Sequence, residues 1–217
     1  MTFPDFSYEK SLWREDFQVI GVDEVGRGCL AGPVYAAAFC VPLTHTLTFL
    51  QELESLGIND SKKLTAPKRE MIAKHLQTLP VHFAIGSSNV TAINTHGIVK
   101  ATNQAMAQAI LKVIEKLKTT NAHILADGPQ ILHPDLEMFK QTPLIKGDSL
   151  SLSIAAASIL AKVARDEYMT ELSQQYPHYF WHENKGYGTL THRQAILNHG
   201  ISNQHRTLFV RNIIQKI

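Results

Sequence analysis

The run Gln18–Gly28, QVIGVDEVGRG, joins an apolar, β-branched stretch to two adjacent carboxylates and a glycine-rich turn. Its apolar part, 19–23, predicts a buried strand. Asp23 and Glu24 at the end of that strand would repel each other unless a cation lay between them. Glycines on both sides of Arg27 let the backbone come close to a ligand. The run therefore predicts a hard metal ion beside a phosphate or sugar, as in metal-assisted chemistry on a phosphodiester.

Composition and charge are those of a globular protein, with 217 residues, 44% hydrophobic residues and a formal net charge of +2. This length allows one substantial core and a small second unit. The start, Met1–Asp5, lacks the features of a signal peptide, and no apolar run is long enough for a membrane span. Cys29 and Cys40 are too few for a disulfide framework, so we expect small core residues in a reducing cytoplasm. The net charge permits nucleic-acid binding if the basic residues cluster.

Strands and helices alternate along the chain after an initial antiparallel pair, which predicts one α/β domain with a mixed sheet. The second strand, 34–41, follows the first after a short gap and should therefore be its antiparallel neighbour. Further strands are expected at 81–86, 123–127 and 143–148, and helices at 47–56, 66–79, 98–117 and 152–175. The chain beyond Pro177 is expected to form short helices and basic loops.

Carboxylates stand at three of the expected strand ends: Asp23 with Glu24, Asp127, and Asp148. Strands that end on one edge of a mixed sheet would bring these acids together, where open α/β sheets bind ligands. Their oxygens, with water and phosphate oxygens, suit Mg²⁺ or Mn²⁺. Asp127 followed by Gly128 is by itself better explained as a turn. For the whole set metal binding is the better explanation, because buried charges need compensation.

Two phosphate-binding motifs are matched in spacing but not in context. The residues 26–31 fit a dinucleotide fingerprint, yet Pro33 and a strand-like run follow where a helix should begin. Gly21 and Gly26 have the spacing of a phosphate loop, but Arg27 follows instead of Lys with Ser or Thr. Both interpretations are excluded.

A tyrosine between glycines, Tyr187 in the run 185–189, can stack on a sugar or base, and an ordinary turn with a packed aromatic is the alternative. His178 and His182 have the spacing of a helical zinc site, but Pro177 and the intervening aromatics argue against one. Several basic residues could follow a phosphate backbone, although a solvated surface role is the alternative for most lysines. They are Lys62, Lys63, Lys146, Lys162, Arg165, Arg193, Arg206 and Arg211.

These motifs, in this order, strongly resemble type 2 ribonuclease H (ribonuclease HII), and the match covers nearly the whole chain. The matching segments are GVDEVGRG at 21–28, GPV at 32–34, NDSKKL at 59–64, DG at 127–128, KGD at 146–148, SIAAASILAKVARD at 153–166, KGYGT at 185–189, and GIS at 200–202 with HR at 205–206.

The resemblance implies one ribonuclease H-like catalytic domain, 1–217, with a helical substrate-binding extension at about 177–217. It also implies Mg²⁺- or Mn²⁺-dependent endonucleolytic cleavage of the RNA strand in RNA–DNA hybrids, and cutting on the 5′ side of ribonucleotides embedded in duplex DNA. A two-metal-ion mechanism would leave 5′-phosphate and 3′-hydroxyl ends.

The resemblance assigns the catalytic, metal-binding acids to Asp23, Glu24, Asp127 and Asp148, with Asp166 a weaker metal candidate. It assigns substrate binding to Gly26, Arg27, Gly28, Lys62, Lys146, Tyr187 and Arg206. The sister class, ribonuclease HIII, typically lacks the arginine of this turn and carries an extra N-terminal domain, so Arg27 and the short N-terminus favour HII. The segment 207–217 departs from the family pattern, which usually has Ser before Phe and a nearby Pro.

The expected partners are RNA–DNA hybrids and DNA duplexes that contain ribonucleotides, with no membrane, and we expect a cytoplasmic monomer. The tail 209–217 is expected to be a packed end, with a sliding-clamp contact as the alternative. A hybrid-binding protein without catalysis would not need all four acids. An exonuclease or phosphotransferase on another acidic scaffold is the competitor among enzymes, and an exonuclease would release a ladder of terminal mononucleotides.

Overall fold

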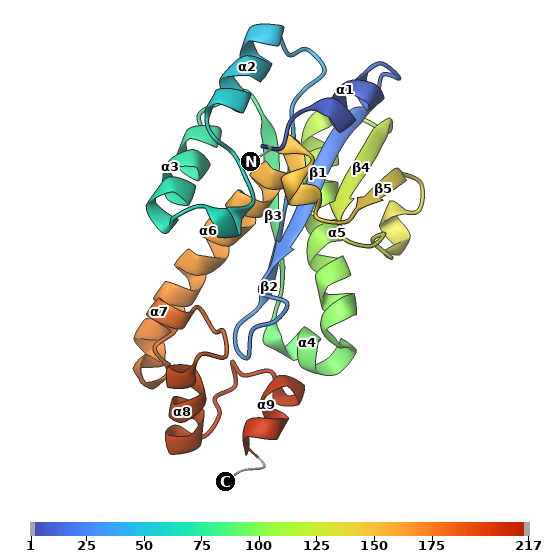
Figure 1. Ribbon diagram of the computed structural model, residues 1–217. Coiled ribbons are helices and arrows are strands. Elements are labelled where there is room, and N and C mark those ends of the chain that lie inside the picture. Colours follow the sequence, from blue (N-terminus) through green and yellow to red (C-terminus); the bar gives the residue numbers. More distant parts are fainter. Residues whose placement is uncertain (1–2, 215–217) are drawn as a thin grey trace.

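A five-stranded mixed sheet lies at the centre of the molecule, in a computed structural model that describes residues 3–214 (Figure 1). The strand order is β3-β2-β1-β4-β5. The strands are β1 (Gln18–Val25), β2 (Val34–Cys40), β3 (His82–Ser88), β4 (Ala122–Asp127) and β5 (Lys140–Leu144). β1 pairs antiparallel with β2 and parallel with β4, so the predicted antiparallel pair and mixed sheet are confirmed.

β1 is longer than expected, because its pairing with β2 continues to Val25 opposite Tyr35. Asp23 and Glu24 therefore lie inside the paired strand and not on the turn after it. Asp23 is held opposite Ala37, and the preceding Val22 lies beside Ala126 of β4. Pairing with β2 therefore holds the backbone of both acids on one side, whereas the pairing with β4 ends just before them at Val22.

Two long helices cover the two faces of the sheet, α5 (Ile98–Leu117) and α6 (Leu152–Gln175), with the predicted bounds (Figure 1). Small residues allow both helices to pack closely against the sheet. A Cβ on Gly86 would lie 2.0 Å from the Ala105 carbonyl oxygen, and one on Gly21 would lie 2.4 Å from the Ser153 backbone. The helices α2 (Leu47–Ser55) and α3 (Ala66–Leu76) pack on the α6 side, and both end slightly earlier than expected.

The expected strand 143–148 is wrong in its bounds. β5 ends at Leu144, and Asp148 lies four residues later in the 3₁₀ turn η3 (Gly147–Ser149). Lys146 takes a left-handed backbone conformation with φ of 58°, which no strand residue adopts, so the chain leaves the sheet before the acid. Asp148 therefore approaches the sheet edge from a turn.

Shorter elements complete the chain. The helix α1 (Ser7–Trp13) precedes β1. The helix α4 (Val90–His96) and the 3₁₀ turns η1 (Ser61–Lys63) and η2 (Pro134–Leu136) lie between the longer elements. Within residues 3–214 both cysteines are buried and free, and no helix has the length and hydrophobicity needed to cross a membrane.

The C-terminal elements pack around Trp181 beyond the end of α6 (Figure 1). They are η4 (Pro177–Tyr179), α7 (Trp181–Asn184), α8 (Leu190–His199) and α9 (Thr207–Ile214). The Trp181 indole N–H donates to Nε2 of His192 across 3.0 Å. Val210 of α9 is fully buried in the same cluster. The end of the expected tail, 215–217, lies outside the described residues.

Candidate active site

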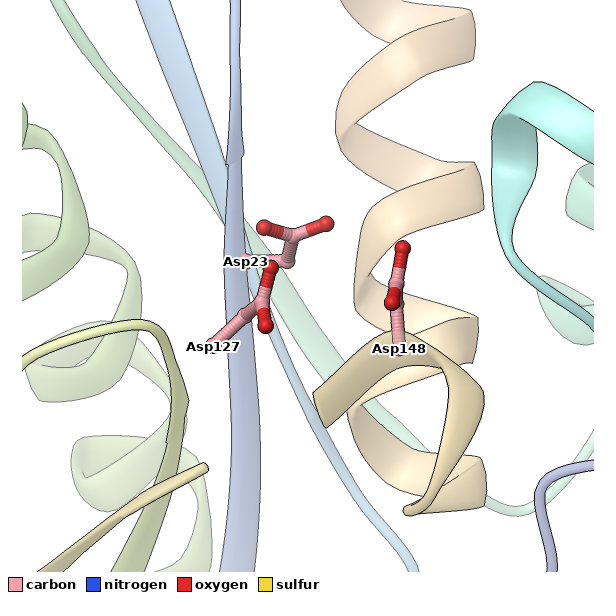
Figure 2. Close-up of side chains that lie close together, drawn as sticks. All are labelled: Asp23, Asp127 and Asp148. Atoms are coloured by element: carbon pink, nitrogen blue, oxygen red, sulfur yellow. The ribbon is translucent and has the colours of Figure 1, made fainter. Parts of the chain in front are cut away.

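Three aspartates meet near the carboxyl ends of the neighbouring strands β1 and β4 (Figure 2). Asp23 comes from β1, Asp127 from the end of β4 and Asp148 from η3. One carboxylate oxygen of each lies within 4.8 Å of the others. Asp23 and Asp148 are only 5% and 7% exposed, so the cluster is largely removed from water. The predicted convergence of these three acids is confirmed.

Burial and mutual repulsion make this cluster unfavourable when all its carboxylates are charged. Burial raises the pKa of Asp23 well above its usual value, and the charges of Glu24 and Asp127 raise it further. Burial also raises the pKa of Asp148, as do the charges of Asp60 and Asp127. A divalent cation among the three carboxylates would remove this penalty, because it supplies the opposite charge. The oxygen-only donor set fits Mg²⁺ or Mn²⁺.

Glu24 lies beside this group but is not one of the three converging residues. Its carboxylate is 3.5 Å from Nη1 of Arg27. Burial raises the pKa of Glu24. The positive charge of Arg27 lowers this pKa and the negative charge of Asp127 raises it, so Glu24 interacts electrostatically with both residues. The side chain of Glu24 thus lies between the aspartates and the glycine turn.

The loop before α3 lies across the cluster from the sheet. The Ser61 hydroxyl bonds to Ser158 of α6 at 3.0 Å, and the Lys63 ammonium donates to Ser149, the neighbour of Asp148, at 3.2 Å. The positive charge of Lys62 lowers the pKa of Asp148 and of Glu24, against the larger effect of burial. Lys62 is exposed, and its charge acts on both of these carboxyls.

The glycine turn and the Tyr187 loop are hydrogen-bonded to each other. The Leu30 N–H donates to the Gly186 carbonyl across 2.8 Å. Gly26 has φ of +91°, and any Cβ there would lie 2.2 Å from Nε of Arg165. Tyr187 is 37% exposed, and burial of its hydroxyl beside Cys29 raises its pKa to about 12. The Tyr187 hydroxyl therefore stays protonated and can donate a hydrogen bond at neutral pH.

Two fully buried arginines hold this pair of loops through backbone carbonyls. Arg165 donates to Pro33, Ala31 and Lys185 at 3.0, 3.2 and 2.8 Å. Arg206 donates to Gly32 and Arg27, both at 2.9 Å. Both side chains are 0% exposed. Arg165 and Arg206 therefore do not belong to a phosphate-facing track, and the expectation of direct substrate contact by Arg206 needs correction.

Two other expected residues are Asp166 and Lys146. Asp166 on α6 forms an ion pair with Lys162 at 2.8 Å and is not in the converging group. Lys146 is exposed and immediately precedes η3, where its carbonyl accepts from the Ser149 N–H at 3.0 Å. Lys162 also lies 5.5 Å from the centre of the Tyr187 ring.

Sequence reasoning gave no role to three further polar residues. Asp60 raises the pKa of Asp148 by its charge, and Ser158 lowers the pKa of Asp23. The third is Glu9 of α1, a fully buried acid. The segment 59–64 matched the family pattern, but no role was given to Asp60, and nothing in the residues around Glu9 distinguishes it from a solvated helix position.

Buried aspartates at the edge of a mixed sheet, next to a glycine turn, define an α/β nuclease that depends on a divalent metal. The sequence model described as Ribonuclease HII matches residues 20–212. A ribonuclease HII of Wolbachia sp. subsp. Brugia malayi is 43% identical over 209 residues, which cover 96% of this chain and 94% of that protein. The chain therefore belongs to the ribonuclease HII family of metal-dependent endoribonucleases that act on RNA–DNA hybrids.

Solved structures with the same fold agree. Bst-RNase HIII, crystallised in complex with Mn²⁺, superposes with a TM-score of 0.72 at 20% identity, covering 92% of this chain and 70% of that one. The RNase HII of Archaeoglobus fulgidus, solved in a complex with PCNA, gives a TM-score of 0.68 at 23% identity over 88% and 94% of the two chains. The ribonuclease H-like fold is thus shared with both.

Proposed function

We propose that this enzyme cuts the phosphodiester on the 5′ side of a ribonucleotide, both in RNA–DNA hybrids and at ribonucleotides embedded in duplex DNA. The observation that carries the proposal is the placement of three buried aspartates within one group, with Glu24 linking that group to the exposed Arg27. Metal-assisted cleavage and recognition of a sugar would then occur side by side.

Asp23, Asp127 and Asp148 would hold the divalent cations, with Glu24 as the fourth acid and Asp166 as a weaker candidate. Bound cations would activate water for in-line attack and stabilise the leaving 3′-oxygen, which leaves 5′-phosphate and 3′-hydroxyl ends. The protein's own contribution is to keep the carboxylates charged and oriented. The hydrogen bond that Asp23 accepts from the Glu24 N–H at 2.7 Å does this for one of them, because it lowers the pKa of the Asp23 carboxyl.

The glycine turn and Tyr187 would select the ribose. Arg27 and Gly28 are exposed, and a Cβ on Gly28 would meet nothing within 4 Å, so the backbone there is open to a ligand. We assign the 2′-hydroxyl contact to the backbone of 26–28, since that hydroxyl distinguishes RNA from DNA. The half-exposed Tyr187 ring would stack on the neighbouring sugar.

Lys62 and Lys146 would contact phosphates, because both are exposed, the charge of Lys62 acts on Asp148, and Lys146 immediately precedes the turn that carries Asp148. Arg206 would act indirectly, by holding the carbonyls of Arg27 and Gly32 that shape the turn. The helices of 177–217 would form a substrate-binding extension of the single catalytic domain, 1–217.

The cofactor would be Mg²⁺ or Mn²⁺, supported by the oxygen donors and by the Mn²⁺ complex of Bst-RNase HIII. The partners would be hybrids and ribonucleotide-containing duplexes, bound by a monomer in the cytoplasm. A sliding-clamp contact is supported only by the PCNA complex of the Archaeoglobus fulgidus relative. The fully buried Val210 in α9 favours a packed end for the described part of the tail.

A series of labelled duplexes with zero, one and four ribonucleotides in one strand tests this function. The wild type should leave the all-DNA duplex intact and cut the other two, and Tyr187→Ala should reduce cleavage at the single ribonucleotide at least tenfold. Arg193→Ala is the control, because its side chain only bonds the Gly188 carbonyl of the same loop. Equal cleavage of a single ribonucleotide by Tyr187→Ala and Arg193→Ala would refute the role of Tyr187.

A further inference from the structure

Glu9 is a carboxylic acid buried in an unusual place, at the junction between α1 and the start of α6. Its side chain is 0% exposed. One oxygen, Oε1, accepts from the Ser151 hydroxyl at 2.6 Å and from the Ser153 N–H at 3.0 Å. The other oxygen has no hydrogen-bond partner among the described residues. Burial of an acid costs stability unless its oxygens are satisfied, so the contacts of Glu9 decide what this side chain does.

The contacts of Glu9 complete the N-terminus of α6. The first N–H groups of a helix have no partner within the helix and must be satisfied from outside. The Leu152 N–H donates to the Asp5 carbonyl at 2.9 Å, and the Ser153 N–H donates to Glu9. The Ile154 N–H donates to the hydroxyl of the cap residue Ser151 at 3.2 Å. The segment before β1 therefore supplies two of the acceptors that fix this helix end.

The same helix end adjoins all three aspartates. Ser151 donates its N–H to the Gly147 carbonyl at 2.8 Å, directly beside Asp148. Gly147 in turn donates its N–H to Asp127 at 2.7 Å. The backbone of Ser153 packs on Gly21, two residues before Asp23, so closely that a Cβ there would lie 2.4 Å away. A shift of the α6 start would therefore displace Asp148 relative to the other two acids.

We propose that Glu9 is a positioning residue, which holds the start of α6 and thereby keeps Asp148 in the geometry that binds the divalent cation. Glu9 precedes the range matched by the family model, residues 20–212, whereas its partners Ser151 and Ser153 lie within that range. The inference rests on the proposed metal site, and its test must separate a failure of that site from a failure of Glu9.

The test measures Mn²⁺ binding to the substrate-free protein by isothermal titration calorimetry. Thermal unfolding of each variant in EDTA measures its stability. Glu9→Ala should weaken Mn²⁺ binding at least fivefold, whereas Glu9→Gln, which keeps the acceptor oxygen, should stay within threefold of the wild type. Ser151→Ala should weaken binding too. Its combination with Glu9→Ala should weaken binding less than the product of the two single effects, because both residues hold the same helix end and are bonded to each other.

Val113→Ala is the control for lost stability, since Val113 is fully buried in α5 on the opposite face of the sheet. It should lower the melting temperature without changing Mn²⁺ affinity. If Glu9→Ala weakens Mn²⁺ binding no more than Val113→Ala does, the positioning role is overturned. If Glu9→Ala does not fold, Ser151→Ala takes its place, and an unchanged affinity there overturns the proposal equally.

The variant Asp148→Asn distinguishes a failure of the metal site from a failure of the role of Glu9. It should weaken Mn²⁺ binding more than any Glu9 variant. A wild type that binds no Mn²⁺, or an Asp148→Asn variant that binds it as tightly as the wild type, would overturn the metal site itself and the inference with it. Weak binding by Asp148→Asn with unchanged binding by Glu9→Ala would overturn the role of Glu9 alone.

Discussion

The backbone N–H of Gly147 donates to Oδ1 of Asp127 across 2.7 Å, which ties the turn carrying Asp148 to the end of β4. Asp148 has no strand of its own to hold it, since β5 ends at Leu144. This bond and the packing of the turn against α6 take the place of a strand. The two acids therefore behave as one unit, and their geometry depends on the helix start as much as on the sheet.

Asp23→Asn should abolish cleavage, by at least about a thousandfold, while making the metal-free protein more stable. Burial and the neighbouring charges raise the pKa of Asp23 in the folded state, so the folded protein binds more protons than the unfolded one above pH 4. The charged carboxylate consequently destabilises the fold at neutral pH. Urea unfolding in EDTA at pH 8 should show that the amide variant has the higher free energy of unfolding.

Asp135→Asn is the matched control, because Asp135 is exposed and paired only with His133. It should change neither cleavage nor stability measurably. A metal-free Asp23→Asn protein that is less stable than the wild type would contradict the electrostatic account of the cluster.

Cleavage should depend on pH and metal concentration together. The pKa values of Asp23, Glu24 and Asp148 are all raised, so protons compete with cations for these carboxylates. Activity should fall as the pH is lowered, and a tenfold higher Mg²⁺ concentration should move this acidic limb to lower pH. Initial rates from pH 5 to 9 at two Mg²⁺ concentrations measure the shift. An acidic limb that stays fixed would show that another group controls it.

Gly21→Ala should reduce stability, whereas Gly28→Ala should reduce cleavage. A Cβ at Gly21 would overlap the backbone of Ser153 and Ile154 at 2.4–2.5 Å, so we expect a loss of stability of about 3 kcal/mol. A Cβ at Gly28 meets nothing within 4 Å, so stability should change by less than about 0.5 kcal/mol. Cleavage at a single ribonucleotide should nevertheless drop for Gly28→Ala, because the Cβ would stand between backbone and ribose. Full activity of Gly28→Ala would remove the turn from the ribose contact.

Arg206→Lys should impair selection of the ribose without weakening metal binding. One ammonium cannot replace the two nitrogens that donate to Gly32 and Arg27, so the turn loses a buried partner. We expect a loss of stability of about 2 kcal/mol and at least a tenfold lower kcat/KM at a single ribonucleotide. Mn²⁺ affinity should stay unchanged. Arg193→Lys, at a more exposed bond to Gly188, is the control.

The sequence predicted the elements with strong internal patterns. The two long helices have small residues at helical spacing, and their bounds were correct to the residue. The end of β5 was missed because it depends on the left-handed backbone of Lys146, which neither charge nor periodicity reveals. The complete order of the strands was not predicted, because strand pairing depends on contacts between residues that are far apart in the chain.

The acids were easier to predict than the residues that support them. Asp23, Asp127 and Asp148 were recognisable because each stands at or near the end of an apolar run. Arg206 was misjudged because its partners are backbone carbonyls, which leave no trace in the sequence. The burial of Glu9 likewise depends on a contact 142 residues away along the chain.

The measurement that tests the central claim most directly is the mapping of the ends produced from a duplex with one embedded ribonucleotide. In Mg²⁺ we expect a single cut on the 5′ side of the ribonucleotide, with a 3′-hydroxyl on the DNA fragment and a 5′-phosphate on the ribonucleotide. EDTA and Asp148→Asn should each prevent it. A cut elsewhere, a ladder of terminal mononucleotides, or an undiminished cut by Asp148→Asn would contradict the account.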